Sequence, residues 1–244
     1  AGLKVAADFE SGMSQVQAIT GATGDEFDAL REKAVDLGAS TSFSSNEVAT
    51  AMAEMGKAGW DTRQIMDGME GVLAAAAASG EGLSSVSTIV ADAITGFKLE
   101  ASDATKVADL LTQAANSGTI DINDLGESFK YVAPVAETMG FSIEDCTTAL
   151  SAMSTAGIKG SQAGTSLRTA FLNMAKPTKP VAAAMDEISL SVTNADGSFK
   201  SMDEILAEMR TSMAGMTDEQ KTQILATIAG KDAVAGLSAV LNMS

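Results

Sequence analysis

Residues 156–168 read Ala-Gly-Ile-Lys-Gly-Ser-Gln-Ala-Gly-Thr-Ser-Leu-Arg and contain three glycines, Gly157, Gly160 and Gly164. Each glycine in a helix interior costs about 1 kcal/mol relative to alanine, so this density is unusual for a helix. Nevertheless, Gly160 and Gly164 begin a stripe at helical spacing that continues through Leu167, Phe171 and Met174. The pattern predicts a helix that ends near Gly157, turns, and restarts near Ser161 with its first turn against a neighbour. A flexible glycine-rich surface loop is the alternative.

The composition predicts an all-α protein. The chain has 244 residues, of which 45% are hydrophobic and only 4% aromatic, so its core must be aliphatic. It is rich in alanine, the strongest helix former, and carries 14 methionines, which fill irregular gaps between helices. Only three prolines interrupt it.

The charge argues against two classes of partner. With 32 acidic and 16 basic residues, the formal net charge is −16. Direct binding to DNA or to an anionic membrane surface needs a basic footprint, so neither is expected. The acidic residues are interpreted as solvated helix faces that keep the chain soluble.

Helix-capping signals recur along the chain. Capping boxes, in which a hydroxyl side chain and an acid or amide three residues later cap each other's backbone N–H, are predicted at Ser44–Glu47, Ser142–Asp145, Ser201–Glu204 and Thr217–Gln220. The apolar stripes reset at each glycine, which disfavours one long coiled coil. We therefore expect antiparallel helical hairpins joined by short glycine loops. Pro134 lies inside one predicted helix and should kink it.

Two features divide the chain further. The proline-containing segment 176–180 predicts a boundary between a helical region at 1–176 and a smaller helical region at 181–244. Residues 188–192 alternate apolar and polar side chains, and Asn194-Ala195-Asp196-Gly197 reads as a turn. A small β-hairpin is therefore predicted near 188–200.

An internal repeat is one interpretation of the sequence. Shifting the chain by 98 positions aligns residues 43–59 with 141–157, so that Ser44 meets Ser142 and Ala58-Gly59 meets Ala156-Gly157. Duplication of a helical hairpin would give stacked helix pairs. The alternative is that capped amphipathic helices converge on similar patterns.

The sequence contains little that indicates a catalytic site. It has no histidine, which excludes triads with an imidazole base and histidine-containing zinc sites, and one cysteine, Cys146, which excludes an internal disulfide. Residues 121–132 fail as a calcium loop because Leu125 and Val132 stand where ligands are required. No catalytic, cofactor or metal site is predicted. Glu137, next to Pro134, is the one candidate carboxylate for glycoside hydrolysis, and a solvated helix face is its alternative.

Two further residues are assigned structural roles. Arg168 lies beside the apolar stripe and could pair with an acid or cap helix carbonyls. Trp60, the only tryptophan, follows Ala58-Gly59 and is expected to fix that turn, with a partner anchor as the alternative.

Three segments together resemble the conserved core of phage tail tape measure proteins over roughly residues 1–180. They are Ala156–Arg168, the stretch from Phe43–Met52 to Ala58-Gly59-Trp60, and Tyr131–Ala136 followed by Met139-Gly140. The resemblance implies a structural module of a phage or prophage tail, without enzymatic activity, located in the virion tail after synthesis in the bacterial cytoplasm. It implies roles in tail assembly, tail-length determination and genome delivery.

Partners and alternatives follow from the same resemblance. Expected partners are a second copy of the chain and the tail tube, tail tip or tail assembly proteins, without sequence-specific nucleic acid binding. A carboxylate-dependent cell-wall hydrolase and a membrane-active module are the alternative functions. Membrane contact is not expected, because the longest apolar run, Val72–Ala78, is far shorter than a spanning helix. Since the chain starts Ala1-Gly2-Leu3 without a signal peptide, we expect a piece of a longer protein.

Overall fold

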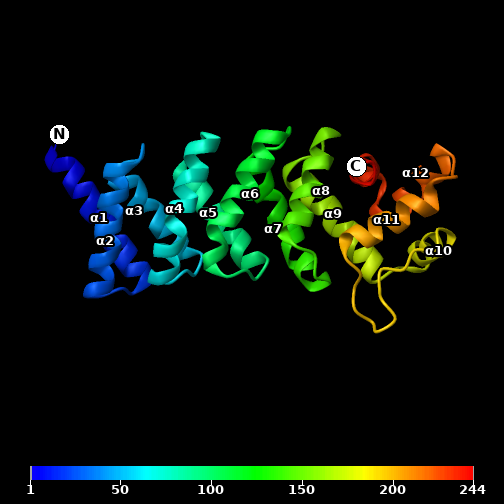
Figure 1. The fold of residues 1–244 in the computed structure, drawn as a ribbon, viewed down its shortest axis with the longest axis horizontal. Helices are drawn as coiled ribbons and strands as arrows, with labels where there is room; N and C mark the ends of the chain where they lie inside the picture. The colour runs from blue at the N-terminus through cyan, green and yellow to red at the C-terminus, as the bar shows by residue number, and fades with distance from the viewer. Residues whose placement is uncertain (1, 244) are drawn as a thin grey trace. The chain divides into compact units, whose positions relative to one another are not determined.

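The computed structural model describes residues Gly2–Met243, and in this range the secondary structure is helical, as predicted. The described chain forms two compact units, the first ending at Asn116 and the second beginning at Ser117. The first unit contains α1 (Gly2–Thr20), α2 (Asp25–Ser40), α3 (Ser45–Lys57), α4 (Thr62–Ser79), α5 (Leu83–Gly96), the 3-10 turn η1 (Ala101–Asp103) and α6 (Ala104–Ser117), whose last residue crosses the boundary (Figure 1).

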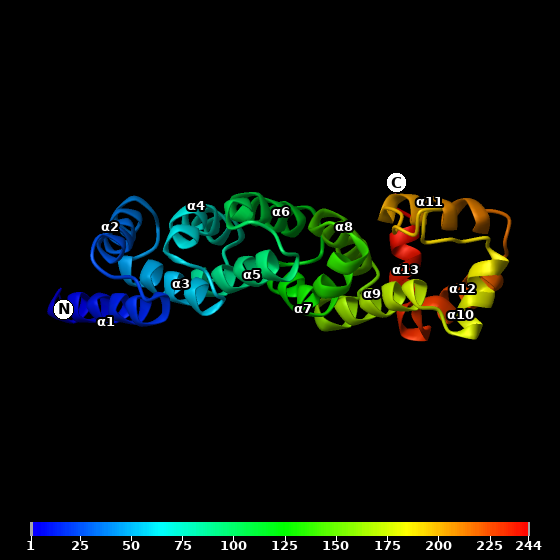
Figure 2. The same cartoon turned by 90° about the horizontal axis from the view of Figure 1, so that it is seen from below.

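The helices of the first unit form two layers. Figure 2 shows α1, α3 and α5 in one row and α2, α4 and α6 in the other. Helix α3 lies at the centre, in contact with α1, α5, α2 and α4. Its Val48, Met52 and Met55 are fully buried, which follows from the apolar stripe on this helix.

Several glycines allow close contacts between helices in this unit. A Cβ built on Gly12 of α1 would lie 3.3 Å from Cβ of Ala49, and one on Gly56 of α3 would lie 2.9 Å from Cγ2 of Ile19. Since the order of these contacts is the same along both helices, α1 and α3 run in the same direction. Gly71 of α4 likewise lies against the backbone of Thr105.

The predicted capping boxes all form. The hydroxyl of Ser44 accepts from the N–H of Glu47, and the N–H of Ser44 donates to Oε2 of Glu47 at 2.8 Å. The boxes at Ser142, Ser201 and Thr217 have the same reciprocal pattern. Each satisfies N–H groups that a helix end leaves without a partner.

The second unit packs around α9. It contains α7 (Ile122–Met139), α8 (Ile143–Thr155), α9 (Gly160–Ala175), α10 (Lys179–Glu187), α11 (Met202–Met213), α12 (Asp218–Ala229), the 3-10 turn η2 (Lys231–Ala233) and α13 (Val234–Leu241). Helix α9 contacts α7, α8, α10, α12 and α13, and α13 also covers α8. The rings of Phe141 and Phe171 meet edge to face with centroids 4.8 Å apart.

The predicted β-hairpin near 188–200 is not present as paired strands. Within Gly2–Met243 the only pairing there is a single antiparallel bridge between Thr193 and Phe199, closed by a turn at Gly197. Residues 188, 190 and 192 are buried and 189 and 191 are exposed, so the alternation in the sequence reflects burial of one side of this segment. The predicted domain boundary at 176–180 falls inside the second unit and stays a prediction.

Candidate functional site

The glycine-rich segment forms the joint between α8 and α9. Helix α8 ends in a left-handed residue, Gly157, with φ +80°, and the N–H of Ile158 donates to the carbonyl of Met153 at 3.1 Å. This six-to-one bond is the Schellman motif, which favours glycine at the left-handed position. Helix α9 then begins at Gly160, where φ is +54°.

Gly164 brings α9 into backbone contact with α7. A Cβ built on Gly164 would lie 2.3 Å from the carbonyl oxygen and 2.7 Å from Cα of Ser128, so only glycine fits between the two helices. One turn earlier, Gly160 lies near Asp124: a Cβ built on Gly160 would lie 3.4 Å from Oδ1 of Asp124. The contacts follow the same order on both helices, so α7 and α9 run in the same direction.

The buried hydroxyl of Ser128 links α7 to the start of α9 at this joint. Its Oγ lies 2.8 Å from the carbonyl oxygens of Asp124, in its own helix, and of Gly160, at the start of α9. The residue is fully buried. Because a buried hydroxyl needs a partner, this bond favours one register between α7 and α9. The sequence signal for it was a small polar residue inside the apolar stripe of residues 125–132.

The remaining predicted residues of the second unit lie away from this contact. Arg168 lies on the exposed side of α9 and has neither an ion pair nor a side-chain hydrogen bond with any residue in Gly2–Met243. Pro134 is exposed within α7, which continues to Met139. Proline has no N–H to donate to the helical carbonyl four residues earlier, so the position suits the solvent side.

Trp60 belongs to the first unit and is buried, with 4% of its surface exposed. The backbone N–H of Trp60 donates to the carbonyl of Met55 at 3.1 Å across Gly59, which has φ +95°. The indole packs on Gly68 of α4, where a built Cβ would lie 2.5 Å from Cζ3 of Trp60. The indole thus occupies the space that a side chain at position 68 would need.

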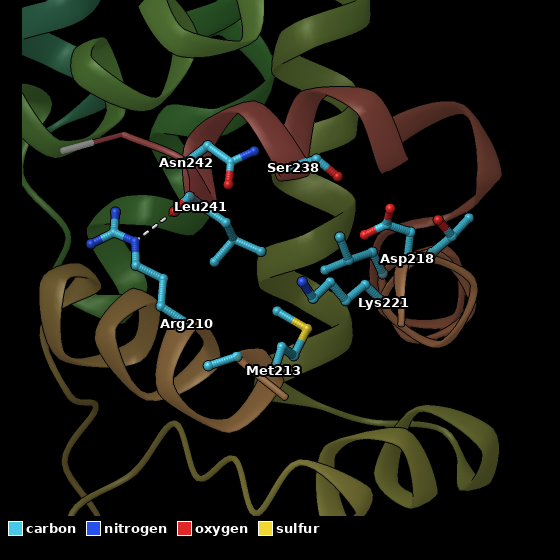
Figure 3. A pocket seen from close by; sticks show the side chains of 10 residues that line it. Arg210, Met213, Asp218, Lys221, Ser238, Leu241 and Asn242 are labelled. Carbon is cyan, nitrogen blue, oxygen red and sulfur yellow. Dashed lines mark hydrogen bonds between the residues drawn. The ribbon is translucent and has the colours of Figure 1, made fainter. Parts of the chain in front are cut away.

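The second unit also contains a pocket between α11, α12 and α13, with a volume of about 610 Å³. Figure 3 shows Arg210 at one side of it, where Nε donates to the carbonyl oxygen of Leu241 at 2.6 Å. This bond caps the last turn of α13 and engages the guanidinium. Asp218 and Lys221 contribute charges of opposite sign to the wall.

Within Gly2–Met243, no group of three or more aspartate, glutamate or cysteine side chains is placed to hold a metal ion. Cys146 is fully buried, and the loss of solvation raises the pKa of its thiol far above the usual range. Such a thiol is not a nucleophile at neutral pH. Glu137 is half-buried on α7.

No single helix in the described range is long and apolar enough to cross a membrane. Helix α12 and the segment Lys231–Leu241 meet the requirement only together, across a bend of 117°.

Known proteins match most of the chain. The profile of a family described as phage-related minor tail protein matches residues 31–230. The chain is 41% identical over 242 residues to the tape measure protein of Pneumococcus phage Dp-1. The aligned region covers 99% of the chain and 21% of that protein. It is 28% identical over 230 residues to the probable tape measure protein of Escherichia phage P2, covering 93% of the chain and 28% of the relative. The chain thus spans between a fifth and a third of these relatives. No solved structure matches it.

Proposed function

The chain belongs to the family of phage-related minor tail proteins, and on this premise we propose that it is a structural helical module of a phage or prophage tail tape measure protein. The observation that carries the proposal is the 41% identity with the Dp-1 tape measure protein over nearly the whole chain. The backbone contact at Gly164 supports a packing role for the glycine-rich segment, because a ligand loop would leave that backbone accessible.

The module serves tail assembly, tail-length determination and genome delivery as part of the longer protein. Its place is the virion tail, after synthesis in the bacterial cytoplasm. Its partners are a second copy of itself and the tail tube, tail tip or tail assembly proteins. The net charge of −16 supports contacts with proteins over sequence-specific contacts with DNA. The module acts without a cofactor and without catalysis.

Repeated helical hairpins are the proposed architecture of the module. In support, α3 and α8 each have 13 residues, begin with a capping box and occupy positions that differ by 98. The helices after them begin at Thr62 and Gly160, again 98 apart. The packing differs, since α3 contacts α1 and α5 whereas α8 contacts chiefly α13. A duplication would therefore have kept the helix ends and changed the neighbours.

Deletion in the phage tests the structural role. An in-frame deletion of this segment from the full-length protein should abolish tails of normal length in electron micrographs of lysates, and the intact gene in trans should restore them. Normal tails that fail only at cell-wall penetration would contradict a structural module and favour the hydrolase alternative. The variant Glu137→Gln should form plaques normally, because no catalysis is proposed for that carboxylate.

A further inference from the structure

A cationic face runs along α9 in a part of the chain that has no acidic side chains. Residues 146–185 contain no aspartate or glutamate, although acidic residues outnumber basic ones 32 to 16 in the whole chain. Arg168 and Leu172 stand four residues apart on α9, Lys176 caps the C-terminal end of this helix, and Lys179 begins α10. These four residues are called the cationic face below. Residues four apart lie on one side of a helix, so Arg168 and Leu172 share one side of α9, and Lys176 follows at the C-terminal end of the helix.

The cationic face is open to solvent. Leu172 is 41% exposed, and Arg168, Lys176 and Lys179 are exposed as well. Among residues Gly2–Met243, none of the three cations has an ion pair or a side-chain hydrogen bond. The other sides of α9 are occupied, by α7 at Gly164 and by the bond from Nδ2 of Asn173 to the carbonyl of Ile228 at 2.7 Å.

The exposed leucine indicates the kind of partner. A nucleic acid backbone offers phosphates to cations but nothing apolar to a leucine between them. A protein helix that carries acids around an aliphatic side chain matches both features of the strip.

Helix α2 of the same chain carries such a strip, called the acidic face below: Asp28, Glu32, Val35 and Asp36. Its acids stand at intervals of four, and Val35 is 41% exposed. The two basic residues of α2 are engaged elsewhere, Arg31 with Glu10 of α1 and Lys33 with Glu70 of α4. Within the described range, the carboxylates of the acidic face have no ion pair or hydrogen bond of their own.

We propose that the acidic face on α2 of one copy docks on the cationic face on α9 of a second copy. The acidic face spaces its carboxylates by four residues, whereas the cationic face places Arg168 and Lys176 eight residues apart on either side of Leu172. Each face carries one exposed aliphatic side chain. The contact joins two different surfaces, so each copy keeps one free surface of either kind, and further copies add head to tail into a closed ring or an open chain. This inference rests on the self-association in the proposed function and names the surfaces that would carry it.

Salt dependence is the first test. In sedimentation velocity experiments on the 244-residue chain, the weight-average mass should rise with protein concentration at about 0.1 M NaCl and fall toward that of a monomer at about 1 M. The rise from about 0.1 M to about 1 M NaCl shortens the screening length between charges from about 10 Å to about 3 Å. A monomer at every concentration and salt level overturns the proposal. It leaves the structural role open, because that role is tested separately by tail formation in the phage.

Charge reversal identifies the two surfaces. Arg168→Glu with Lys176→Glu should lower self-association at least tenfold, and Asp28→Lys with Glu32→Lys should do the same. Each variant alone presents like charges on both faces. An equimolar mixture should associate again, because the acidic α9 of one variant then meets the basic α2 of the other.

Controls separate this pairing from effects of net charge and folding. Lys57→Glu with Arg63→Glu changes the net charge by as much as the α9 variant does, on exposed side chains outside both faces, and should leave association unchanged. All variants should keep the circular dichroism spectrum and melting temperature of the original chain. Failure of the mixture to associate overturns the proposal. The proposal is also overturned if the chain does not self-associate but binds duplex DNA in a salt-sensitive way, and if Arg168→Glu with Lys176→Glu abolishes that binding.

Discussion

Gly164 is the residue at which the packing of the second unit leaves no room for a side chain. Its neighbour is the backbone of Ser128, which cannot rotate away as a side chain could. We expect Gly164→Ala to force α7 and α9 apart and to lower the free energy of unfolding by about 1–3 kcal/mol, the usual cost of overpacking. Chemical denaturation followed by circular dichroism measures this change.

The matched control for Gly164 is Gly215. A Cβ at Gly215 would meet nothing within 4 Å, and its φ is not in the left-handed region. Gly215→Ala should therefore be neutral or slightly stabilising, since alanine reduces the entropy of the unfolded chain. Equal effects of the two substitutions would show that the contact with Ser128 is not tight in solution.

Ser189 shows the opposite case, a side chain where glycine would fit better. It is exposed, has φ +50°, and occupies the left-handed position of a Schellman motif in which the N–H of Leu190 donates to the carbonyl of Met185 at 2.9 Å. A left-handed non-glycine residue costs about 1–2 kcal/mol. Ser189→Gly should therefore raise the melting temperature. The free energy of unfolding should rise by about 0.5–1 kcal/mol, after the entropy that glycine loses on folding is subtracted. The same change at Ser11, inside α1, should lower it.

At the scale of single helices, the capping boxes make stability depend on pH. The backbone N–H and hydroxyl of Ser44 donate to the Glu47 carboxylate and lower its pKa below the ordinary value of 4.5. Ser201 lowers the pKa of Glu204 in the same way. Because the folded state favours the ionised form, this stabilisation is complete above about pH 4.5 and is lost as the pH falls through the lowered pKa.

Glu47→Gln tests this linkage. The glutamine keeps a hydrogen-bond acceptor but cannot ionise, so the variant should be less stable than the original chain at pH 7. The difference should shrink toward pH 3, as measured by urea denaturation at each pH. Gln220→Ala removes the partner of a box without a carboxylate, and its cost, about 0.5–2 kcal/mol for a lost cap, should be the same at both pH values.

Helix ends were predictable from the sequence because capping is local chemistry. A hydroxyl and an acid three residues apart satisfy each other's N–H groups in any context, so the boxes at Ser44 and Ser142 were confirmed. The predicted β-hairpin is not shown beyond a single bridge between Thr193 and Phe199, because alternating burial does not by itself require strand pairing. Ile188, Leu190 and Val192 are buried and alternate with exposed serines as in a strand, but no ladder of paired residues forms there. The role of Ser128 was missed because its partner in α9 lies 32 residues away in the sequence.

For the whole molecule, the sequence identified the family before it identified any surface. The resemblance drawn from three short segments is confirmed by the family match and by relatives named as tape measure proteins. The complementary faces on α2 and α9 were not foreseen, because the sequence alone does not say which charges are already paired. Arg31 and Lys33 belong to the same helix as the acidic face. Their ion pairs with Glu10 and Glu70 show that these two cations are engaged outside that face.

Folding of the module can be linked to its role by a temperature-sensitive phage. If tail assembly needs the packed module, Gly164→Ala in the full-length protein should allow normal tails at low temperature and abolish them several degrees below the limit of the parent phage. A loss of 1 kcal/mol lowers a melting temperature by about 2–4 °C in a domain of this size. Tail lengths in electron micrographs of lysates grown at both temperatures measure the effect, and Gly215→Ala is the control. Normal tails at the high temperature, from a variant whose purified module has melted there, would mean that assembly does not depend on this fold.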